Sequence, residues 1–134
     1  KIKFEQGYNR PAPRDYVGQT PLSVPESTAM FDFTRNHDFS LILAYHTQGE
    51  VIYWKYLDEE PEGARRIAEY FSKVSGYRIE ETPAASGYAG YNFYDRPGYT
   101  IEAGLGENPL PMGQFPKIYK DNVGILLGGM TELE

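Results

Sequence analysis

Short apolar runs of strand type alternate along this chain with segments of helical periodicity, and this alternation constrains the fold more than any other feature. The run over residues 39–46 is nearly continuous in apolar side chains, and the run over 50–56 is rich in Val, Ile, Tyr and Trp. Strands that alternate with helices along a chain are typical of layered α/β proteins. We therefore predict an α/β fold with a mixed, largely parallel sheet and flanking helices.

Helices are expected before and after these two strands. Ser23 and Glu26 have the spacing of a capping box, which predicts a helix over 24–36. Apolar residues at helical spacing predict a second helix over 60–74, with Gly76 placed to cap its C-terminus. The remaining expectations are an irregular arm over 1–21, a turn over 47–49, a loop over 83–90, a strand over 99–103 and a helix over 114–127.

Composition excludes several classes of protein. The chain has 134 residues, of which 40% are apolar, and this size fits one compact domain. Its net charge of −6 argues against binding to nucleic acid or to an anionic membrane surface. No apolar stretch reaches the roughly 20 residues that a membrane-spanning helix needs. Because cysteine is absent, any transition-metal site must use histidine and carboxylates.

Two ionisable residues, His46 and Glu102, close apolar runs of strand type. Ligand crevices of open α/β sheets lie at the carboxyl ends of the strands, so this pair is the first candidate for a functional site. An imidazole at a strand end can be a metal ligand, a proton carrier or a structural residue. A buried carboxylate would have a raised pKa, as a general base requires, but Glu102 could instead form an ion pair with an arginine such as Arg96.

Two neighbouring residues give weaker signals. Glu50 follows His46 by four positions, yet a strand–turn–strand connection need not place both side chains on one side, so the pair is a weak indication of metal binding. His37 is expected at the exposed C-terminal end of the first helix, where the helix dipole favours a cation. We assign His37 no function.

Four segments of the sequence, taken in order, resemble the C-terminal half of the zinc carboxypeptidase family: PLSVPESTAM, LAYHTQGEVIYW, PAASGYAG and RPGYTIEAGLGENPLP. The similarity is greatest to the bacterial γ-D-glutamyl-L-diamino-acid endopeptidases, which cut peptidoglycan stem peptides. The resemblance implies that His46, followed by a threonine, is the third zinc ligand, and that Glu102 in the Thr-x-Glu segment is the catalytic base. It also implies a partial zinc-carboxypeptidase-like fold, in which residues 1–134 form the C-terminal part of one metallopeptidase catalytic domain.

The resemblance further indicates where a peptide substrate would bind. In this family the loop that contains the Ala-Ser-Gly segment lines the pocket for the residue after the cut. Small residues in that loop would leave room for a long side chain such as diaminopimelate. The candidate substrate-binding residues are Thr47, Gln48, Tyr88, Ala89, Gly90 and Tyr91.

Other features of the family do not occur in the sequence. Neither histidine begins an H-x-x-E motif, which supplies the first two zinc ligands in the family. Asn9-Arg10 lies too close to PLSVPES to be the pair that grips the substrate carboxylate. We therefore expect a chain that starts within a longer protein, lacks the N-terminal half of the catalytic domain, has an incomplete zinc ligand set and is inactive alone.

Alternatives of two other classes remain open. Twelve tyrosines and one tryptophan could give a stand-alone module a stacking surface for peptide or glycan, although such residues are equally at home in a core. Two copies of the chain could also build a metal site between them as a homodimer. For location, the resemblance favours the cell wall, the extracellular space or the spore, with a cytoplasmic recycling enzyme as the alternative.

Overall fold

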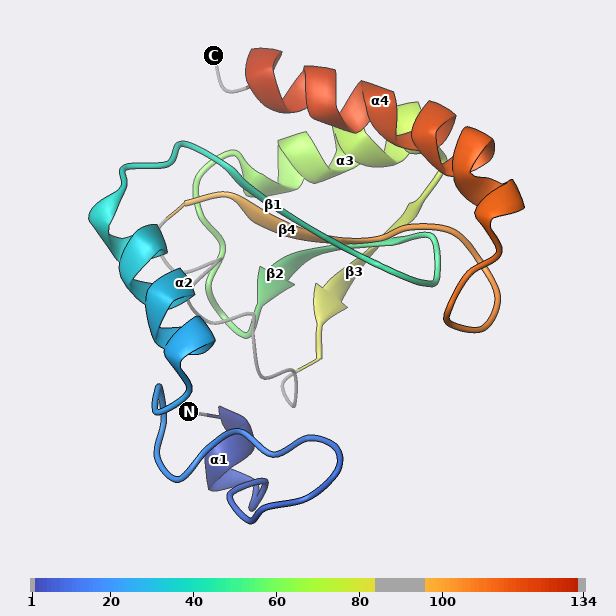
Figure 1. Ribbon diagram of the computed structural model, residues 1–134. Helices are drawn as coiled ribbons and strands as arrows, with labels where there is room; N and C mark the ends of the chain where they lie inside the picture. The colour runs from blue at the N-terminus through green and yellow to red at the C-terminus, as the bar shows by residue number, and fades with distance from the viewer. Residues whose placement is uncertain (1, 84–95, 133–134) are drawn as a thin grey trace.

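The computed structural model describes residues 2–83 and 96–132, without the side chain of Ile2. Within these ranges the chain forms helices and strands in the alternating order that the sequence predicts (Figure 1). The elements are α1 (Ile2–Glu5), α2 (Pro25–Asn36), β1 (Ile42–His46), β2 (Val51–Tyr56), α3 (Ala64–Ser75), β3 (Arg78–Thr82), β4 (Gly98–Glu102), the 3-10 helix η1 (Met112–Gln114) and α4 (Phe115–Thr131).

The four strands form one mixed sheet in the order β1-β4-β2-β3. The outer pairs, β1 with β4 and β2 with β3, are parallel, and the central pair, β2 with β4, is antiparallel. The predicted fold class, a mixed and largely parallel sheet with flanking helices, is therefore confirmed. The turn over 47–49 does not join neighbouring strands, because β4 inserts between β1 and β2 and pairs with both.

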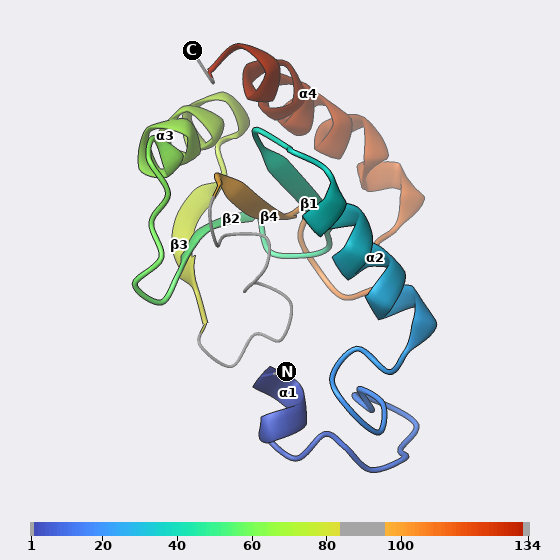
Figure 2. The same ribbon diagram turned by 90° about the vertical axis from the view of Figure 1, so that its left-hand side faces the viewer.

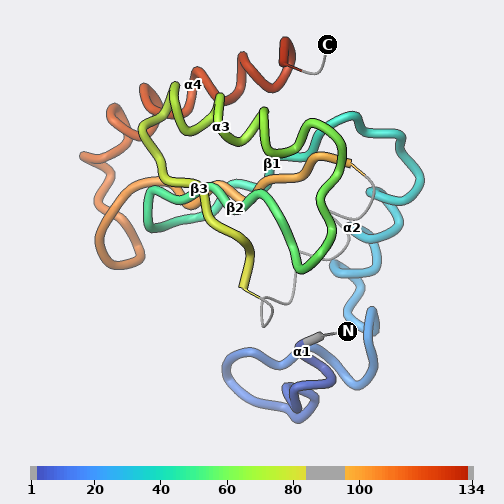
Figure 3. Tube along the Cα trace, turned by 180° about the vertical axis from the view of Figure 1, so that it is seen from behind, coloured from blue at the N-terminus to red at the C-terminus, as the bar shows by residue number. Residues whose placement is uncertain are grey.

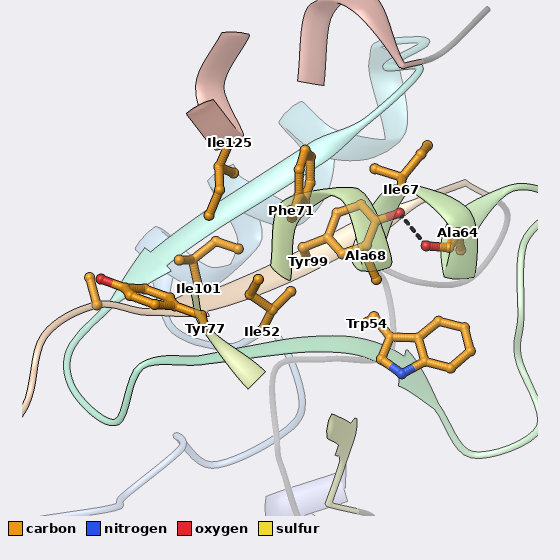
Figure 4. Close-up of a cluster of buried hydrophobic side chains, with 11 residues drawn as sticks. Ile52, Trp54, Ala64, Ile67, Ala68, Phe71, Tyr77, Tyr99, Ile101 and Ile125 are labelled. Atoms are coloured by element: carbon orange, nitrogen blue, oxygen red, sulfur yellow. Dashed lines mark hydrogen bonds between the residues drawn. The ribbon is translucent and has the colours of Figure 1, made fainter. Parts of the chain in front are cut away.

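Helices α3 and α4 lie side by side over the same face of the sheet (Figures 1 and 3). Alternate residues of β2 and β4 point toward these helices, as the two-residue period of a strand requires. Figure 4 shows the resulting core, in which the Tyr99 hydroxyl donates a hydrogen bond of 2.8 Å to the carbonyl of Ala64. The core cluster consists of Ile52, Trp54, Ala64, Ile67, Ala68, Phe71, Tyr77, Tyr99, Ile101, Ala103 and Ile125.

Glycines of α4 allow close contacts with its neighbours. A Cβ atom on Gly128 would lie 2.1 Å from Cε1 of Tyr70 in α3, so no larger residue fits without movement of that ring. At the next position along α4, a Cβ atom on Gly129 would lie 3.6 Å from methyl carbons of Leu41 and Leu43. Helix α4 therefore contacts α3 along one side and β1 along another.

The start of α2 differs from the capping box that the sequence predicts. The N-cap residue is Val24, with Pro25 in the first turn, and no side chain caps the helix. Ser23 lies one position too early, and its hydroxyl instead accepts a hydrogen bond of 3.3 Å from the amide of Thr20. The helix itself was predicted correctly, but the capping-box prediction was wrong.

The other helix predictions hold with shifted ends. Helix α3 begins at Ala64 rather than at position 60, after Gly63 in a left-handed conformation with φ of 75°. Its C-terminus is capped by Gly76, as predicted, through a bond from the Gly76 amide to the Ser72 carbonyl. Helix α4 continues to Thr131, four residues beyond the predicted end at 127.

Strand β3 has no counterpart among the predictions. Its sequence, RIEET, contains one strongly apolar residue, and its side chains are mostly exposed because β3 is the outermost strand of the sheet. The irregular arm over 1–21 contains the single helical turn α1 and lies on the far side of the molecule from α3 and α4 (Figure 2). In the part of the chain that the structure describes, none of the helices has the length and apolar character to cross a membrane.

Candidate active-site edge

His46 and Glu102 are the last residues of two neighbouring parallel strands, β1 and β4. They are also direct partners in the register of this pair, so their Cα atoms lie opposite each other. Neighbouring strands run about 4.8 Å apart, and partners in register project to the same face. His46 is exposed and Glu102 is half-buried. The structure therefore brings the two residues singled out in the sequence to one edge and one face of the sheet.

Backbone hydrogen bonds continue past the ends of both strands and hold the two following loops together. The Ala103 amide donates to the His46 carbonyl at 2.9 Å, and the Gly49 amide donates to the Gly104 carbonyl at 2.8 Å. Gly49 has φ of +143°, and a Cβ atom there would lie 4.0 Å from Cβ of Glu102. The two loops thus leave the sheet in contact, beside the candidate base.

A reciprocal side-chain contact joins the same two loops. The Thr47 hydroxyl donates to Oδ1 of Asn108 at 2.7 Å, and Nδ2 of Asn108 donates to the Thr47 carbonyl at 3.0 Å. Gln48 follows across a cis peptide bond, and its side chain is exposed. Of the two substrate-binding candidates in this loop, Thr47 therefore bonds to the neighbouring loop, whereas Gln48 is presented to solvent.

Tyr53 lies beside the candidate site and was missed by sequence reasoning. In the antiparallel register Val51 lies opposite Glu102 and Tyr53 lies opposite Thr100, so Tyr53 shares the face of Glu102. Burial, followed by the negative charges of Glu80 and Glu102, raises the pKa of the Tyr53 phenol, and Arg78 lowers it. The signal was available in the two-residue period of β2, which places residues 51 and 53 on one face.

Arg78 lies at the start of β3, two strands away from Glu102 in the sheet. One of its guanidinium nitrogens donates to the Gly49 carbonyl at 2.9 Å, and its Nε donates to Glu80 at 2.6 Å. The sequence offered no signal for this contact, because it depends on β3, which was not predicted. Arg78 thus attaches the loop after His46 to the far edge of the sheet.

Lys117 of α4 bonds to the same loop from the other side. Its Nζ lies 2.7 Å from Oε1 of Glu50 and 2.5 Å from Oδ2 of Asp121. The hydrogen bonds with Asp121 and Glu50, in that order of size, raise the pKa of the Lys117 ammonium. Glu50 therefore bonds to a lysine, and this contact does not support a metal site built from His46 and Glu50.

The predicted alternative role for Glu102 was an ion pair with Arg96, and the two residues lie at opposite ends of β4. Arg96 precedes the first residue of β4. One of its guanidinium nitrogens donates to the His37 carbonyl at 3.2 Å and to the Phe39 carbonyl at 3.1 Å. Glu102 lies at the other end of that strand, which rises about 3.3 Å per residue. His37 caps α2, as expected for a C-terminal residue, and its Nδ1 lies 2.7 Å from the Phe33 carbonyl.

The candidate residues Tyr88, Ala89, Gly90 and Tyr91 lie outside the described residues. Over residues 2–83 and 96–132, no group of three or more histidines and carboxylates is arranged to hold a metal ion. An imidazole at a strand end is a suitable zinc ligand, but a zinc site in a protein needs three or four protein ligands in total. The described residues therefore fit one part of a zinc site and do not complete it.

Comparisons with known proteins agree with the geometry. A sequence profile described as zinc carboxypeptidase matches residues 3–122. The chain is 47% identical over 125 residues to Gamma-D-glutamyl-L-diamino acid endopeptidase 1 of Lysinibacillus sphaericus, covering 90% of this chain and 31% of that protein. It is 40% identical over 121 residues to the uncharacterized protein YqgT of Bacillus subtilis strain 168, covering 87% and 32%. The chain thus spans about a third of the length of these relatives.

A solved structure shows the same fold. Carboxypeptidase A from Helicoverpa armigera superimposes with a TM-score of 0.66 and 14% identity, covering 87% of this chain and 36% of that chain. At this identity the likeness concerns the fold alone. The profile, in contrast, covers most of the present sequence, from before α2 to within α4. This chain therefore belongs to the zinc carboxypeptidase family.

Proposed function

We propose that residues 1–134 are the C-terminal part of the catalytic domain of a zinc peptidase. Its substrate would be a peptidoglycan stem peptide, cut at the bond between γ-D-glutamate and a diamino acid such as diaminopimelate. The observation that carries this proposal is the pairing of His46 with Glu102 at the carboxyl edge of the sheet. It occurs in a chain 47% identical to a protein named for that endopeptidase activity.

In this proposal Glu102 is the general base and His46 is a zinc ligand. Zinc, when bound, would activate a water molecule and polarise the scissile carbonyl. Glu102 would accept the proton of that water and return it to the leaving amine, and its half-buried position favours such proton transfer. His46 would bind in its neutral form through one ring nitrogen, at the exposed end of β1.

The remaining ligands and the residues that grip the substrate would come from the rest of the protein. The support for this is that the chain covers 31% and 32% of two relatives, and that the described residues hold no complete metal cluster. The partner of this chain is thus the N-terminal half of its own catalytic domain. We infer that the chain is inactive by itself and that a homodimer is not its working state.

Specificity for a diamino acid would be set on the face of the sheet that carries Glu102. Tyr53 shares that face, and Gln48 is presented to solvent beside it. The family resemblance gives further candidates for substrate binding, and they remain part of the proposal: Thr47, Tyr88, Ala89, Gly90 and Tyr91. Thr47 would act mainly by positioning the loop, because its hydroxyl bonds to Asn108.

The test uses the full-length protein that contains this sequence, a γ-linked D-glutamyl-diaminopimelate peptide and its α-linked isomer. Glu102→Gln should lower turnover of the γ-linked peptide by about 100- to 10,000-fold, the usual range for a lost acid–base catalyst, with zinc retained. His46→Ala should lose zinc, measured by elemental analysis. Glu69→Gln, on the exposed side of α3, and His37→Ala are matched controls that should change neither property.

Four outcomes would each contradict one part of the proposal. Full turnover in Glu102→Gln would remove this residue as the base, and unchanged zinc content in His46→Ala would remove that residue as a ligand. Equal cleavage of the two isomeric peptides would leave a zinc peptidase with another substrate. In addition, stoichiometric zinc on the 134-residue chain alone, as monomer or dimer, would show that it completes a metal site unaided.

A further inference from the structure

Four residues, each the register partner of the next, form a row across the sheet: His46, Glu102, Val51 and Arg78. The first two end their strands and the last two begin theirs, so the row runs along a single edge of the sheet. Partners in register project to the same face, and neighbouring strands lie about 4.8 Å apart. The Cα atom of Arg78 is therefore about 10 Å from that of Glu102, on the face that carries the candidate base.

Side-chain contacts bring the Arg78 guanidinium close to Glu102. Nη1 of Arg78 donates to the Gly49 carbonyl at 2.9 Å. Gly49 in turn lies beside Glu102, since a Cβ atom on Gly49 would be 4.0 Å from Cβ of Glu102. Val51, which lies between them in the row, is buried. A single glycine thus separates the guanidinium from the side chain of the candidate base.

The guanidinium is held in position and is accessible. Its Nε donates to Oε1 of Glu80 at 2.6 Å. This bond and the bond to Gly49 engage two of the five N–H donors that an arginine side chain has. The side chains of Arg78 and Glu80 are 60% and 44% exposed. The two residues therefore present a positive and a negative group to solvent beside the candidate site.

Tyr53 shows that these charges share one face with Glu102. In the row next to the edge, Tyr53 is the register partner of Thr100 on one side and of Glu80 on the other. Burial, then the negative charges of Glu80 and Glu102, raise the pKa of the Tyr53 phenol, and the positive charge of Arg78 lowers it. One side chain thus lies within electrostatic reach of all three charged groups.

An exposed ion pair stabilises a fold very little, so stability gives no strong reason for this one. Its chemistry suits recognition instead. A guanidinium binds a carboxylate through two parallel hydrogen bonds, and a carboxylate accepts hydrogen bonds from an ammonium group. The pair of Arg78 and Glu80 is therefore complementary to a group that carries both an ammonium and a carboxylate. Diaminopimelate has such a group at the far end of its side chain, whereas lysine has the ammonium alone.

We propose that Arg78 and Glu80 determine specificity by binding the far end of the diamino-acid side chain. Arg78 would bind its carboxylate and Glu80 its ammonium group. The inference rests on the proposed function, because it needs a substrate whose scissile bond lies at Glu102 and whose side chain extends along the row. A lysine in the same place would leave the guanidinium without its anion, and the site would select diaminopimelate.

Two peptides that differ only in the far carboxyl group test this: γ-D-glutamyl-diaminopimelate and γ-D-glutamyl-lysine. Binding is measured by calorimetry in the full-length protein with Glu102→Gln, which permits binding without cleavage. The diaminopimelate peptide should bind about 10- to 100-fold more tightly, the range for hydrogen bonds to a charged group. Adding Arg78→Gln should abolish this preference and leave the affinity for the lysine peptide unchanged.

Two further variants complete the set. Adding Glu80→Gln should weaken the binding of both peptides, because both carry the ammonium group, and undiminished affinity for the lysine peptide would remove Glu80 from the site. Arg65→Gln is the matched control, since it removes the same charge from an exposed position on α3, where Arg65 bonds to Glu69. It should alter neither affinity.

Three results would overturn the role of Arg78. Equal weakening of both peptides by Arg78→Gln would show that this residue only holds the loop that contains Gly49. Equal affinity for the two peptides while Arg78 is intact would show that the far carboxylate is not bound. Binding of neither peptide would show that the face carries no such site.

Turnover by the protein with Glu102 intact separates this inference from the proposed function. A preference for diaminopimelate that Arg78→Gln abolishes, in a protein that does not cleave the γ-linked bond, would retain the binding site and reject the proposed activity. Cleavage of the γ-linked peptides by a protein that binds both equally would do the reverse.

Discussion

Helices α3 and α4 cover the same face of the sheet, yet their outward sides differ in character. On α3 the buried residues Ile67 and Phe71 face the core, and the outward positions are polar, with Arg65 and Glu69 in a salt bridge of 3.1 Å. On α4 the outward side includes Leu126 and Met130, which are 47% and 70% exposed. The comparison shows that the outward side of α3 has the polar, charged character of an ordinary protein surface, whereas the outward side of α4 exposes large apolar side chains.

The number and arrangement of exposed apolar residues distinguish an ordinary surface from a surface that associates with a partner. A single exposed leucine is common on any protein surface. Four large apolar residues exposed on one side of α4 are a different observation, because an extended apolar surface is more often a site of interaction than a single exposed residue is. They are Phe115, Tyr119, Leu126 and Met130.

The largest difference should appear between a buried aromatic side chain of α3 and an exposed leucine of α4. Phe71 of α3 is fully buried, and its ring lies 5.1 Å from that of Tyr99. Phe71→Ala should lower the free energy of unfolding of the 134-residue chain by about 3–5 kcal/mol, because a cavity replaces the ring. Leu126→Ala on the outward side of α4 should change it by less than about 0.5 kcal/mol. Urea unfolding followed by circular dichroism measures both, and comparable losses would refute the contrast.

An intermediate effect is expected where the two helices touch. Gly128→Ala would place a Cβ atom 2.1 Å from the Tyr70 ring. Displacing the ring should cost about 1–3 kcal/mol, partly offset by the roughly 1 kcal/mol that alanine gains over glycine in a helix. The net result should be a lower melting temperature. Gly113→Ala is the control, because a Cβ atom there meets nothing within 4 Å. A melting temperature that is unchanged or higher in Gly128→Ala would show that α3 and α4 can separate freely.

The smallest effect concerns the hydrogen bond between the sheet and α3. Tyr99→Phe removes the donor to the Ala64 carbonyl, at 2.8 Å, and should cost about 1 kcal/mol at neutral pH. Burial raises the pKa of the fully buried Tyr99 phenol, and partial burial raises the pKa of Tyr45, which is 41% exposed, to about 12. The unfolded chain loses these protons near pH 10 and the folded chain keeps them, so stability should fall as the pH rises above about 10.

The Tyr99→Phe variant also tests the predicted fall in stability at high pH. Tyr99→Phe has one fewer phenol to titrate on unfolding, so its stability should decline less than that of the unmodified chain between about pH 10 and 12. Urea titrations at several pH values give the two slopes. Parallel slopes would mean that Tyr99 ionises equally well in the folded state, and the burial argument would fail.

The sequence was sufficient to predict the parts of the fold that depend on local patterns. His46 and Glu102 were found because each ends an apolar run, and Gly76 was recognised as a cap because glycine accepts a left-handed conformation. The capping box failed because the spacing of Ser23 and Glu26 does not specify which residue begins the helix.

The remaining features depend on contacts between distant segments. Strand β3 follows no apolar pattern, since an outermost strand buries few side chains. The contact of Arg78 with Gly49 could not be predicted either, because Arg78 belongs to that strand. The insertion of β4 between β1 and β2 depends on pairing between strands about fifty positions apart in the sequence. The local periodicity of apolar residues does not indicate which strands pair. Asn108 was likewise missed, because its bond to Thr47 spans 61 positions.

The pairing of His46 with Glu102 also bears on how this protein tolerates change. Their separation is imposed by the main-chain ladder of β1 and β4, which every residue type except proline can form. Apolar residues on the opposite face, such as Ile101, can thus be exchanged for others of similar volume without altering the distance between the two side chains. For an engineer, the geometry of the proposed site and the packing of the core are therefore separately adjustable, and changes in the loops beyond the strand ends would alter neither.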